Sequence, residues 1–444
     1  MKRRIWVYVL LFFLVTINYM DRTNLSVASA PIAQALHLQP ATLGILFSSF
    51  LWVYLIVLIP AGIATDRWGA RLTNAISIVV WSLASIWTGL SSSFMTLLFS
   101  RLGMGLGEAP TYPASARTVS QWAPASERGR AVASYNAGSY AGPAVGALVV
   151  GWLVTQFGWR ASFYVTGALG FVWLLVWLIW YRKPEDAKWL KKEEQKKILA
   201  ERDMAVGEEH SKHGILYLLK YKGMWGVMLT QSCAVYAQYL FLTWLPNYLE
   251  TARGLTVLRS SLFSALPYFI AVVFGILFAV VSDRLLTNET RNTGARRTGV
   301  VISMIISAVV LLTPYVHSIT MIVVLISISL TFISTSITMN ITLTNDLLRV
   351  PGSSGQANSL LMIGGNIFGL LAPIVTGFVV QITGQFTGAF LIAGILLIAG
   401  AIISFTLTRT GIGERDSEPL EQQNFDSFAL QAPSPINQQA TGQS

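Results

Sequence analysis

Long apolar runs with very few charged residues constrain this 444-residue chain more than any other feature. Charged residues make up only 12% of the chain, whereas a soluble domain carries roughly 25%. A helix that crosses a bilayer needs about 20 mostly apolar residues. The sequence predicts twelve such segments, at residues 5–28, 42–64, 73–93, 95–118, 131–154, 162–181, 223–249, 261–282, 298–316, 319–342, 357–380 and 387–408. We therefore expect an all-α membrane protein with twelve transmembrane helices.

The first segment has a second interpretation, as a cleaved signal peptide. Basic residues at 2–4 precede its apolar run, and residues 28–30 (Ala-Ser-Ala) resemble a cleavage site. However, Asp21 and Arg22 interrupt the region that a signal peptide keeps apolar. We therefore expect a retained first helix.

The distribution of Lys and Arg predicts the orientation in the membrane. Most of the 31 basic residues fall before the first helix or on connections that share its side, whereas the opposite side holds Arg160, Arg253 and Arg259. Cytoplasmic loops are the ones enriched in Lys and Arg. Both termini are thus expected in the cytoplasm of a bacterial inner membrane, and the net charge of +10 reflects topology and not a nucleic-acid site.

A long polar stretch divides the segments into six plus six. Residues 182–222 are rich in Lys and Glu, which is typical of a surface helix or a flexible linker. The expected organisation is a first half at 1–181, a cytoplasmic linker at 182–222, a second half at 223–408 and a disordered tail at 409–444.

Few residues are available for metal binding or catalysis. Cys233 is the single cysteine, and the four histidines lack metal-ligand spacing. The chain contains no recognisable nucleophile–base arrangement or phosphate loop, so neither an enzyme nor a bound metal or cofactor is expected. A receptor built on a carrier fold would need an added signalling domain, for which little chain remains.

A motif repeats at equivalent places in the two halves. Residues 62–71 contain Gly62, Asp66, Arg67, Gly69 and Arg71 after the second segment, and Asp283-Arg284 follows the eighth. Such an echo indicates duplicated halves. An Asp beside an Arg at a helix end can tie one half to the other by charge pairing, which predicts a conformational switch.

These features resemble the major facilitator superfamily and, within it, the anion:cation symporter group of bacterial sugar-acid and organic-acid carriers, relatives of sialin and the vesicular glutamate transporters. The motif at 62–71, the six-plus-six pattern and the central linker carry the first resemblance. The second depends on residues 18–25, 47–54, 59–62, 105–113, 127–128 and 241–249, together with Arg101.

Four ionisable residues fall inside predicted spans, where each costs roughly 2.5–3.5 kcal/mol at a helix centre. Asp21 and Arg22 lie in the first segment, and Arg101 and Glu108 in the fourth. Residues of this kind are normally paired and face a transport path. We expect all four to meet in one water-accessible chamber between these two helices.

Their charges suggest a coupling mechanism. Two cations and two carboxylates sum to about zero, so a substrate carboxylate would leave one unpaired negative charge, and a proton on Asp21 or Glu108 would restore the balance. Arg22 is the expected substrate ligand, because a guanidinium binds a carboxylate with two parallel hydrogen bonds. Arg101 is expected to pair with Glu108 or Asp21. The resemblance likewise implies proton-carrying acids at positions 21 and 108 and a substrate-binding arginine at 22.

The remaining cavity candidates are polar or aromatic residues. The resemblance implies that Tyr54 contacts substrate. Galactonate-type carriers have a glutamine where this chain has Ser139 and an asparagine where it has Met362, which makes a smaller or less polar acid plausible. Further candidates are Tyr140, Asn136, Asn340, Thr342 and Asn366.

The sequence thus predicts a monomeric proton-coupled symporter of a small organic anion, which would work by alternating access. An exporter or an anion exchanger of the same fold is the alternative, because residues 138–146 resemble the fifth helix of proton-coupled exporters. The same run of small residues is also typical of close helix packing.

Overall fold

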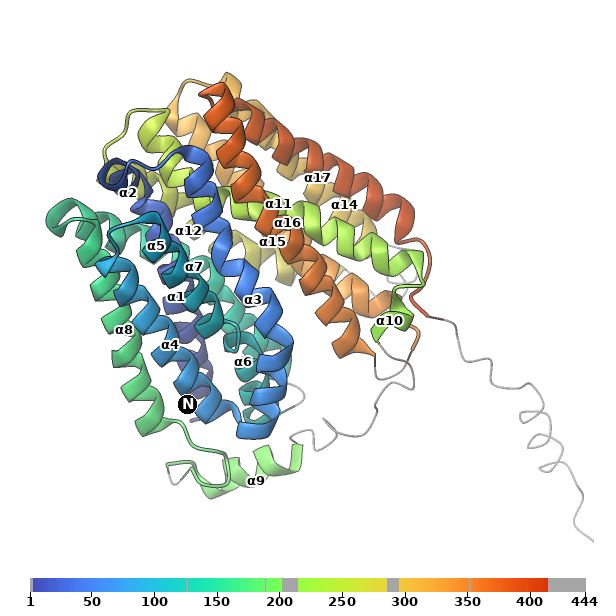
Figure 1. Cartoon of the computed structure of the whole chain (residues 1–444). Coiled ribbons are helices and arrows are strands. Elements are labelled where there is room, and N and C mark those ends of the chain that lie inside the picture. The colour runs from blue at the N-terminus through green and yellow to red at the C-terminus, as the bar shows by residue number, and fades with distance from the viewer. Residues whose placement is uncertain are drawn as a thin grey trace, which may run out of the picture.

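The computed structural model is a bundle of long helices (Figure 1). It describes residues 3–124, 127–187, 189–201, 215–285, 295–350 and 353–413, with side chains left undescribed at 276–285 and 295. The predicted tail therefore lies almost entirely outside the described residues.

The helices of the first half follow one another through short turns. They are α1 (Ile5–Val27), α2 (Ser29–Leu36), α3 (Pro40–Trp68), α4 (Ala70–Leu90), α5 (Phe94–Glu108), α6 (Thr111–Trp122), α7 (Arg128–Phe157) and α8 (Trp159–Trp180). The short helices α9 (Lys192–Glu201) and α10 (Ile215–Leu218) belong to the predicted linker. The second half contains α11 (Lys222–Thr251), α12 (Val257–Leu285), α14 (Ala295–Ser307), η2 (Ala308–Tyr315), α15 (Ile319–Leu347), α16 (Ser354–Thr383) and α17 (Thr387–Leu407).

Each predicted span corresponds to a helix or a pair of helices. Within the described residues, ten helical segments are long and apolar enough to cross a membrane, and α14 with η2 counts as one of them. The fourth predicted span is instead divided into α5 and α6, because Ala109 and Pro110 lie between the two helices. The seventh, α11, carries polar residues such as Gln231 and Asn247 on a helix that is buried along most of its length. The all-α, twelve-span prediction is confirmed with these two local differences.

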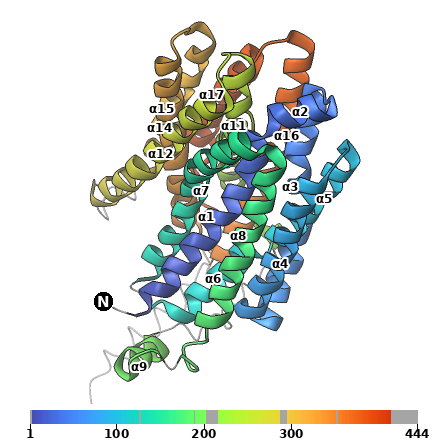
Figure 2. The same cartoon turned by 90° about the vertical axis from the view of Figure 1, so that its left-hand side faces the viewer.

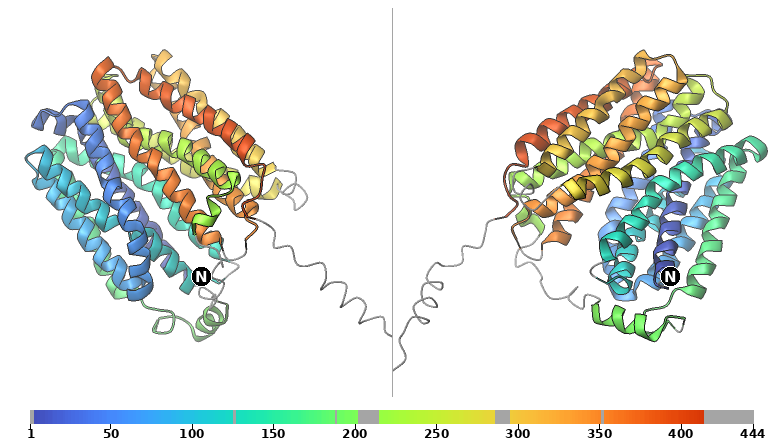
Figure 3. Two further views of the ribbon diagram at one scale, coloured as in Figure 1. Left: turned by 45° about the vertical axis from the view of Figure 1, so that its right-hand side comes forward. Right: turned by 180° about the vertical axis from the view of Figure 1, so that it is seen from behind.

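The two halves touch at one end and separate at the other (Figures 1 and 3). The contact end is the one away from the N terminus, where α3 packs on α16 and α7 packs on α12. Ser48 Oγ donates to the Leu370 carbonyl at 2.8 Å, and Ser26 Oγ donates to the Thr243 carbonyl at 2.7 Å. The structure therefore captures the protein closed at this end.

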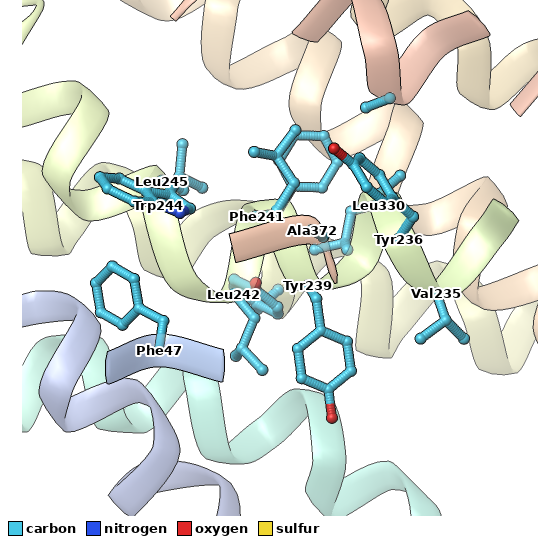
Figure 4. Close-up of a cluster of buried hydrophobic side chains, with 14 of the residues drawn as sticks. Phe47, Val235, Tyr236, Tyr239, Phe241, Leu242, Trp244, Leu245, Leu330 and Ala372 are labelled. Atoms are coloured by element: carbon cyan, nitrogen blue, oxygen red, sulfur yellow. The ribbon is translucent and has the colours of Figure 1, made fainter. Parts of the chain in front are cut away.

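Aromatic side chains fill the closed end (Figure 4). Phe47 of α3 meets the Trp244 ring of α11 edge-on, with 5.1 Å between ring centroids. Trp244 in turn packs on Phe386, beside the start of α17. Burial of apolar rings supplies about 25 cal/mol per Å² of area, so this cluster stabilises contact between the halves.

Two glycines allow the backbones of α3 and α16 to approach. A Cβ on Gly44 would lie 2.5 Å from the Pro373 carbonyl oxygen, and one on Gly377 would lie 2.6 Å from the Pro40 carbonyl oxygen. No side chain fits at these distances, so helix contact at the closed end requires glycine.

We predict that Gly44→Val opens this end. Overpacking costs about 1–3 kcal/mol, so labelling of a Ser48→Cys reporter by an impermeant maleimide should become about tenfold faster. Ser48 is fully buried here, and Cys233 is only 2% exposed. Gly355→Val on α16 is the matched control, because no atom lies within 4 Å of its added Cβ. Equal labelling rates in the two variants would contradict the prediction.

The part of the linker that contains α9 is bound to the first half, whereas α10 packs on α16 of the second half. Arg4 is 1% exposed and forms two hydrogen bonds of 2.8 Å with the Glu127 carboxylate. Its backbone N–H, together with that of Arg3, donates to Glu194 of α9 at 3.1–3.2 Å. Trp189 also stacks on Trp122 with ring centroids 5.2 Å apart. Of the two expected forms, a surface helix is the one observed, and Figure 2 shows α9 beneath the first half.

Candidate functional site

A polar cavity of about 260 Å³ lies between the two halves. Its walls come from α1, α3, α6 and α7 on one side and α11, α15 and α16 on the other. The lining residues are Tyr19, Arg22, Tyr54, Tyr112, Tyr135, Asn136, Ser139, Tyr140, Gln231, Val235, Gln238, Tyr239, Ile337, Thr338, Ile341, Met362, Gly365 and Asn366. Within the described part of the chain, Arg22 is the one charged residue of this lining.

Arg22 is held from two directions. Its Nε donates to Glu108 Oε2 of α5 at 2.6 Å, and both side chains are almost fully buried. The rings of Tyr19, Phe50 and Tyr54 surround the guanidinium at 4.5–5.2 Å from their centroids. These contacts fix the guanidinium at the cavity wall through a charged hydrogen bond and cation–π attraction.

One donor of this guanidinium remains available. Within the described residues, Arg22 Nη2 is buried and has no hydrogen-bond partner, and the same holds for Glu108 Oε1. An unmade hydrogen bond on a buried charged group is costly. Arg22 lines the cavity, so a small shift of the side chains that cover Nη2 would let a carboxylate in the cavity satisfy it.

Asp21 does not lie at this cavity, contrary to our expectation. It is fully buried and accepts a hydrogen bond of 3.1 Å from Ser85 of α4. The same hydroxyl lies 3.2 Å from Thr166 of α8. Successive residues of a helix point about 100° apart, so Asp21 faces into the first half while Arg22 faces the cavity.

Arg101 also differs from expectation. It is 1% exposed, and its Nη1 lies 2.6 Å from the Met104 sulfur. Its guanidinium sits 5.2 Å from the Phe50 ring centroid. Among the described residues, Arg101 forms no ion pair within 4.0 Å, because Glu108 is paired with Arg22 instead. The single chamber predicted for all four charges is therefore wrong for this conformation: Arg22 alone reaches the cavity, with Glu108 directly behind it.

Most of the polar and aromatic candidates do line the cavity. Tyr54, Ser139, Tyr140, Met362 and Asn366 belong to its wall. Asn136, a further candidate, does so as well, whereas Thr342 is exposed and is absent from the lining.

Asn340 does not line the cavity but contacts a residue that does. Its Nδ2 donates to the Val227 carbonyl at 2.9 Å and to Gln231 Oε1 at 3.0 Å. Gln231 itself lines the cavity. Asn340 therefore orients an amide that faces the cavity and does not face it directly.

Several lining residues escaped the sequence prediction. Gln231 and Gln238 are two turns apart on α11 and face the cavity together. Their i, i+7 spacing, which places both amides on one face of α11, is the signal that could have identified them. Gln238 Nε2 also donates to the Tyr140 hydroxyl at 3.2 Å, which joins the two halves across the cavity. The tyrosines Tyr19, Tyr112, Tyr135 and Tyr239, together with Thr338, carry no such signal.

The motif at 62–71 lies at the open end. Asp66 pairs with Arg117 of α6 at 3.1 Å, and Arg71 donates to the Leu178 carbonyl at 2.8 Å. Both partners belong to the first half, so these contacts do not tie the halves together in this conformation. Gly69 has φ +81°, which explains the glycine at the turn between α3 and α4.

The other motif residues contribute less to the observed contacts. An added Cβ on Gly62 would meet no atom within 4 Å, and Arg67 is exposed. The side chains of the predicted counterpart, Asp283 and Arg284, lie outside the described residues.

The small-residue run at 138–146 is used for packing. A Cβ on Gly138 would lie 2.8 Å from the Phe12 carbonyl oxygen, and one on Gly142 would lie 2.5 Å from Tyr19 Cβ. Both glycines therefore allow α7 to pack closely on α1. The feature that suggested an exporter has this structural explanation.

Two helical halves that enclose a polar cavity within the membrane define the class of secondary transporters. The chain belongs to the Major Facilitator Superfamily, whose family description matches residues 11–294 and 290–437. It is thus a membrane-spanning transporter and not an enzyme.

Two curated relatives and one solved structure illustrate the similarity. The chain is 30% identical to the probable galactarate/D-glucarate transporter GudP of Escherichia coli (strain K12), over 95% of this chain and 96% of that protein. It is 31% identical to the D-galactonate transporter of Escherichia coli O6:H1, over 89% and 94%. A bacterial homologue of the human lysosomal transporter Spinster shares the fold, with a TM-score of 0.71, 18% identity and coverage of 94% and 99%. The two curated relatives confirm the resemblance to bacterial sugar-acid carriers.

Proposed function

We propose that this protein carries a small organic anion across the bacterial inner membrane in symport with protons, by alternating access. The observation that carries the proposal is Arg22, a cation on the cavity wall whose Nη2 has no hydrogen-bond partner among the described residues. The named sugar-acid relatives support an organic acid as the substrate.

The cavity lining favours a hydroxylated carboxylate. Gln231, Gln238, Asn136 and Asn366 are amides that donate to and accept from hydroxyl groups. Galactonate-type carriers have amides where this chain has Ser139 and Met362, and that difference led to the expectation of a less polar acid. The four amides of the lining compensate for it. A sugar acid therefore fits this cavity better than a plain fatty or aromatic acid.

The pair formed by Arg22 and Glu108 supports symport. An anion that draws the Arg22 guanidinium away from Glu108 leaves this buried carboxylate unpaired, and taking up a proton costs less than leaving the charge unpaired. Anion and proton then favour each other's binding, because such linkage is reciprocal. Asp21 is a second candidate proton site, separated from the cavity by α1.

The predicted membrane orientation also assigns the conformational state of the transporter. With the N terminus in the cytoplasm, as the basic loops predict, the open end faces the cytoplasm. Asp66 and its motif would then form contacts between the halves only in the opposite state, when that end closes. We further propose that one monomer forms the complete transport unit, because one chain supplies both walls of the cavity.

Transport by the purified full chain in proteoliposomes tests the proposal. D-glucarate, galactarate and D-galactonate should be taken up when the outside is acidified, and uptake should collapse when an ionophore removes the gradient. Counterflow without a pH gradient would report substrate binding and exchange separately from proton-driven accumulation. Uptake that is unaffected by the pH gradient would favour an anion exchanger, and uptake of none of these acids would contradict the substrate class.

A further inference from the structure

A lipid-facing groove runs between the two halves near the closed end. It has a volume of about 840 Å³ and is lined by α7 of the first half and by α12 and the start of α15 of the second. A neighbouring groove of about 460 Å³ between α12 and α15 shares Phe263, Leu266 and Thr320 with it. Within the described residues, the two grooves therefore form one apolar track along α12.

The lining of the larger groove has a polar end and an apolar body. Arg259 and Thr320 are its polar members, and both lie near the closed end of the molecule. The remaining lining is apolar: Ala144, Val145, Leu148, Leu255, Leu262, Phe263, Ala265, Leu266, Phe269 and Ile319. This division matches a molecule with one charged end and a long hydrocarbon chain.

The length of the groove fits one membrane leaflet. Arg259 and Phe269 are ten residues apart on α12, which corresponds to about 15 Å at the helical rise of about 1.5 Å per residue. The hydrocarbon core of a bilayer is about 30 Å thick. With Arg259 at the level of the headgroups, the groove would reach about the middle of the membrane.

Arg259 differs from the other arginines at this end. Arg253 donates to the Tyr248 hydroxyl at 2.9 Å and to the Val316 carbonyl at 3.0 Å. Arg160 stacks on Trp159 at 4.3 Å and donates to the Ser91 carbonyl. In the described part of the chain, the Arg259 guanidinium has no hydrogen-bond or ion-pair partner, and only its backbone N–H is bonded.

Glu250, an acidic residue of the preceding helix, bonds to the neighbour of Arg259 in the sequence and not to Arg259 itself. Glu250 accepts a hydrogen bond of 3.1 Å from Ser260, the residue next to Arg259. A guanidinium at the headgroup level of an apolar groove attracts an anionic headgroup, and the apolar walls of the groove offer van der Waals contacts to an acyl chain.

We propose that this groove binds one anionic phospholipid, with its phosphate on Arg259 and an acyl chain between α7 and α12. Because the walls belong to different halves, the site is complete only while α7 and α12 are in contact. The lipid therefore stabilises the conformation seen here. The proposal does not depend on the transported substrate or on proton coupling.

Thermal stability of the delipidated full chain in detergent tests the site, with phosphatidylglycerol compared with phosphatidylcholine. A ligand that binds only the folded protein raises its stability in proportion to occupancy. Phosphatidylglycerol should raise the melting temperature of the wild type more than phosphatidylcholine does. For Arg259→Gln, about tenfold more phosphatidylglycerol should be needed, as expected for one lost charged hydrogen bond.

Two further variants and inorganic phosphate serve as controls for this experiment. Val145→Trp, which fills the groove from an exposed position on α7, should remove the phosphatidylglycerol effect although Arg259 remains. Arg160→Gln is the matched control and should respond like the wild type. The proposal is overturned if Arg259→Gln responds like the wild type, if the two lipids act equally, or if inorganic phosphate alone reproduces the gain.

Discussion

Arg22→Ala is expected to weaken binding of the transported acid by about 30-fold to 4,000-fold. Truncating one member of a buried, hydrogen-bonded charge pair costs about 2–5 kcal/mol, and each 1.4 kcal/mol is a factor of about ten. In this structure Arg22 is the charged residue of the described cavity lining, and its Nη2 is directed to no other described group. The loss should be visible as the absence of a ligand-dependent thermal shift with D-glucarate and D-galactonate.

The single substitution has a side effect that must be separated from binding. Arg22→Ala leaves Glu108 buried without its 2.6 Å partner, which destabilises the fold by itself. The double variant Arg22→Ala/Glu108→Gln removes both charges and should recover stability but not binding. Arg22→Lys keeps the charge without the planar fork, so it should bind more weakly than the wild type. Normal affinity in the double variant would exclude Arg22 as the substrate ligand.

Much of the fold was predictable because the membrane imposes simple rules. Helices must satisfy their own backbone hydrogen bonds in the bilayer, so long apolar runs indicate helices almost without ambiguity. The division of the fourth span was not predicted, although Pro110 lies within it. Proline has no backbone N–H to donate, so the helical hydrogen bonding is interrupted at Pro110, although Ala109 and Pro110 both keep helical backbone angles.

The site was predicted only in part, because a sequence gives the faces of one helix but not its neighbours. Asp21 and Arg22 were expected in one chamber, yet a rotation of about 100° places them on different faces of α1. Spacing likewise could not decide which cation would pair with Glu108. The structure selects Arg22, and Arg101 instead packs against Phe50 and Met104.

The second half contributes through polar residues that look ordinary in a sequence. Gln231 and Gln238 were not expected, although their common face on α11 is readable in retrospect. Asn340 was expected in the cavity but instead orients Gln231. Polar side chains in membrane helices often bond to a neighbouring helix, and only the packed structure separates these from the ones that face the cavity.

Glu108→Gln is expected to abolish accumulation driven by a pH gradient while leaving counterflow in place. Glutamine has the shape of a protonated glutamic acid but binds and releases no proton at this position. It also leaves Arg22 free of its carboxylate partner in every state, so the acid should still bind, and binding should lose its dependence on pH. The readout is uptake into proteoliposomes with an imposed pH gradient, beside counterflow at equal pH.

Asp21→Asn is the matched comparison, because it makes the same chemical change on the far side of α1. Asp21 bonds to Ser85 and not to Arg22, so its neutral form should leave substrate affinity nearly unchanged. If Asp21 carries a second proton, Asp21→Asn should lower the extent of accumulation without removing it. If Glu108→Gln still concentrates the acid against its gradient, the coupling does not run through the Arg22–Glu108 pair. In that case the proton would bind at a group other than Glu108, and Arg22 would take part in substrate binding alone.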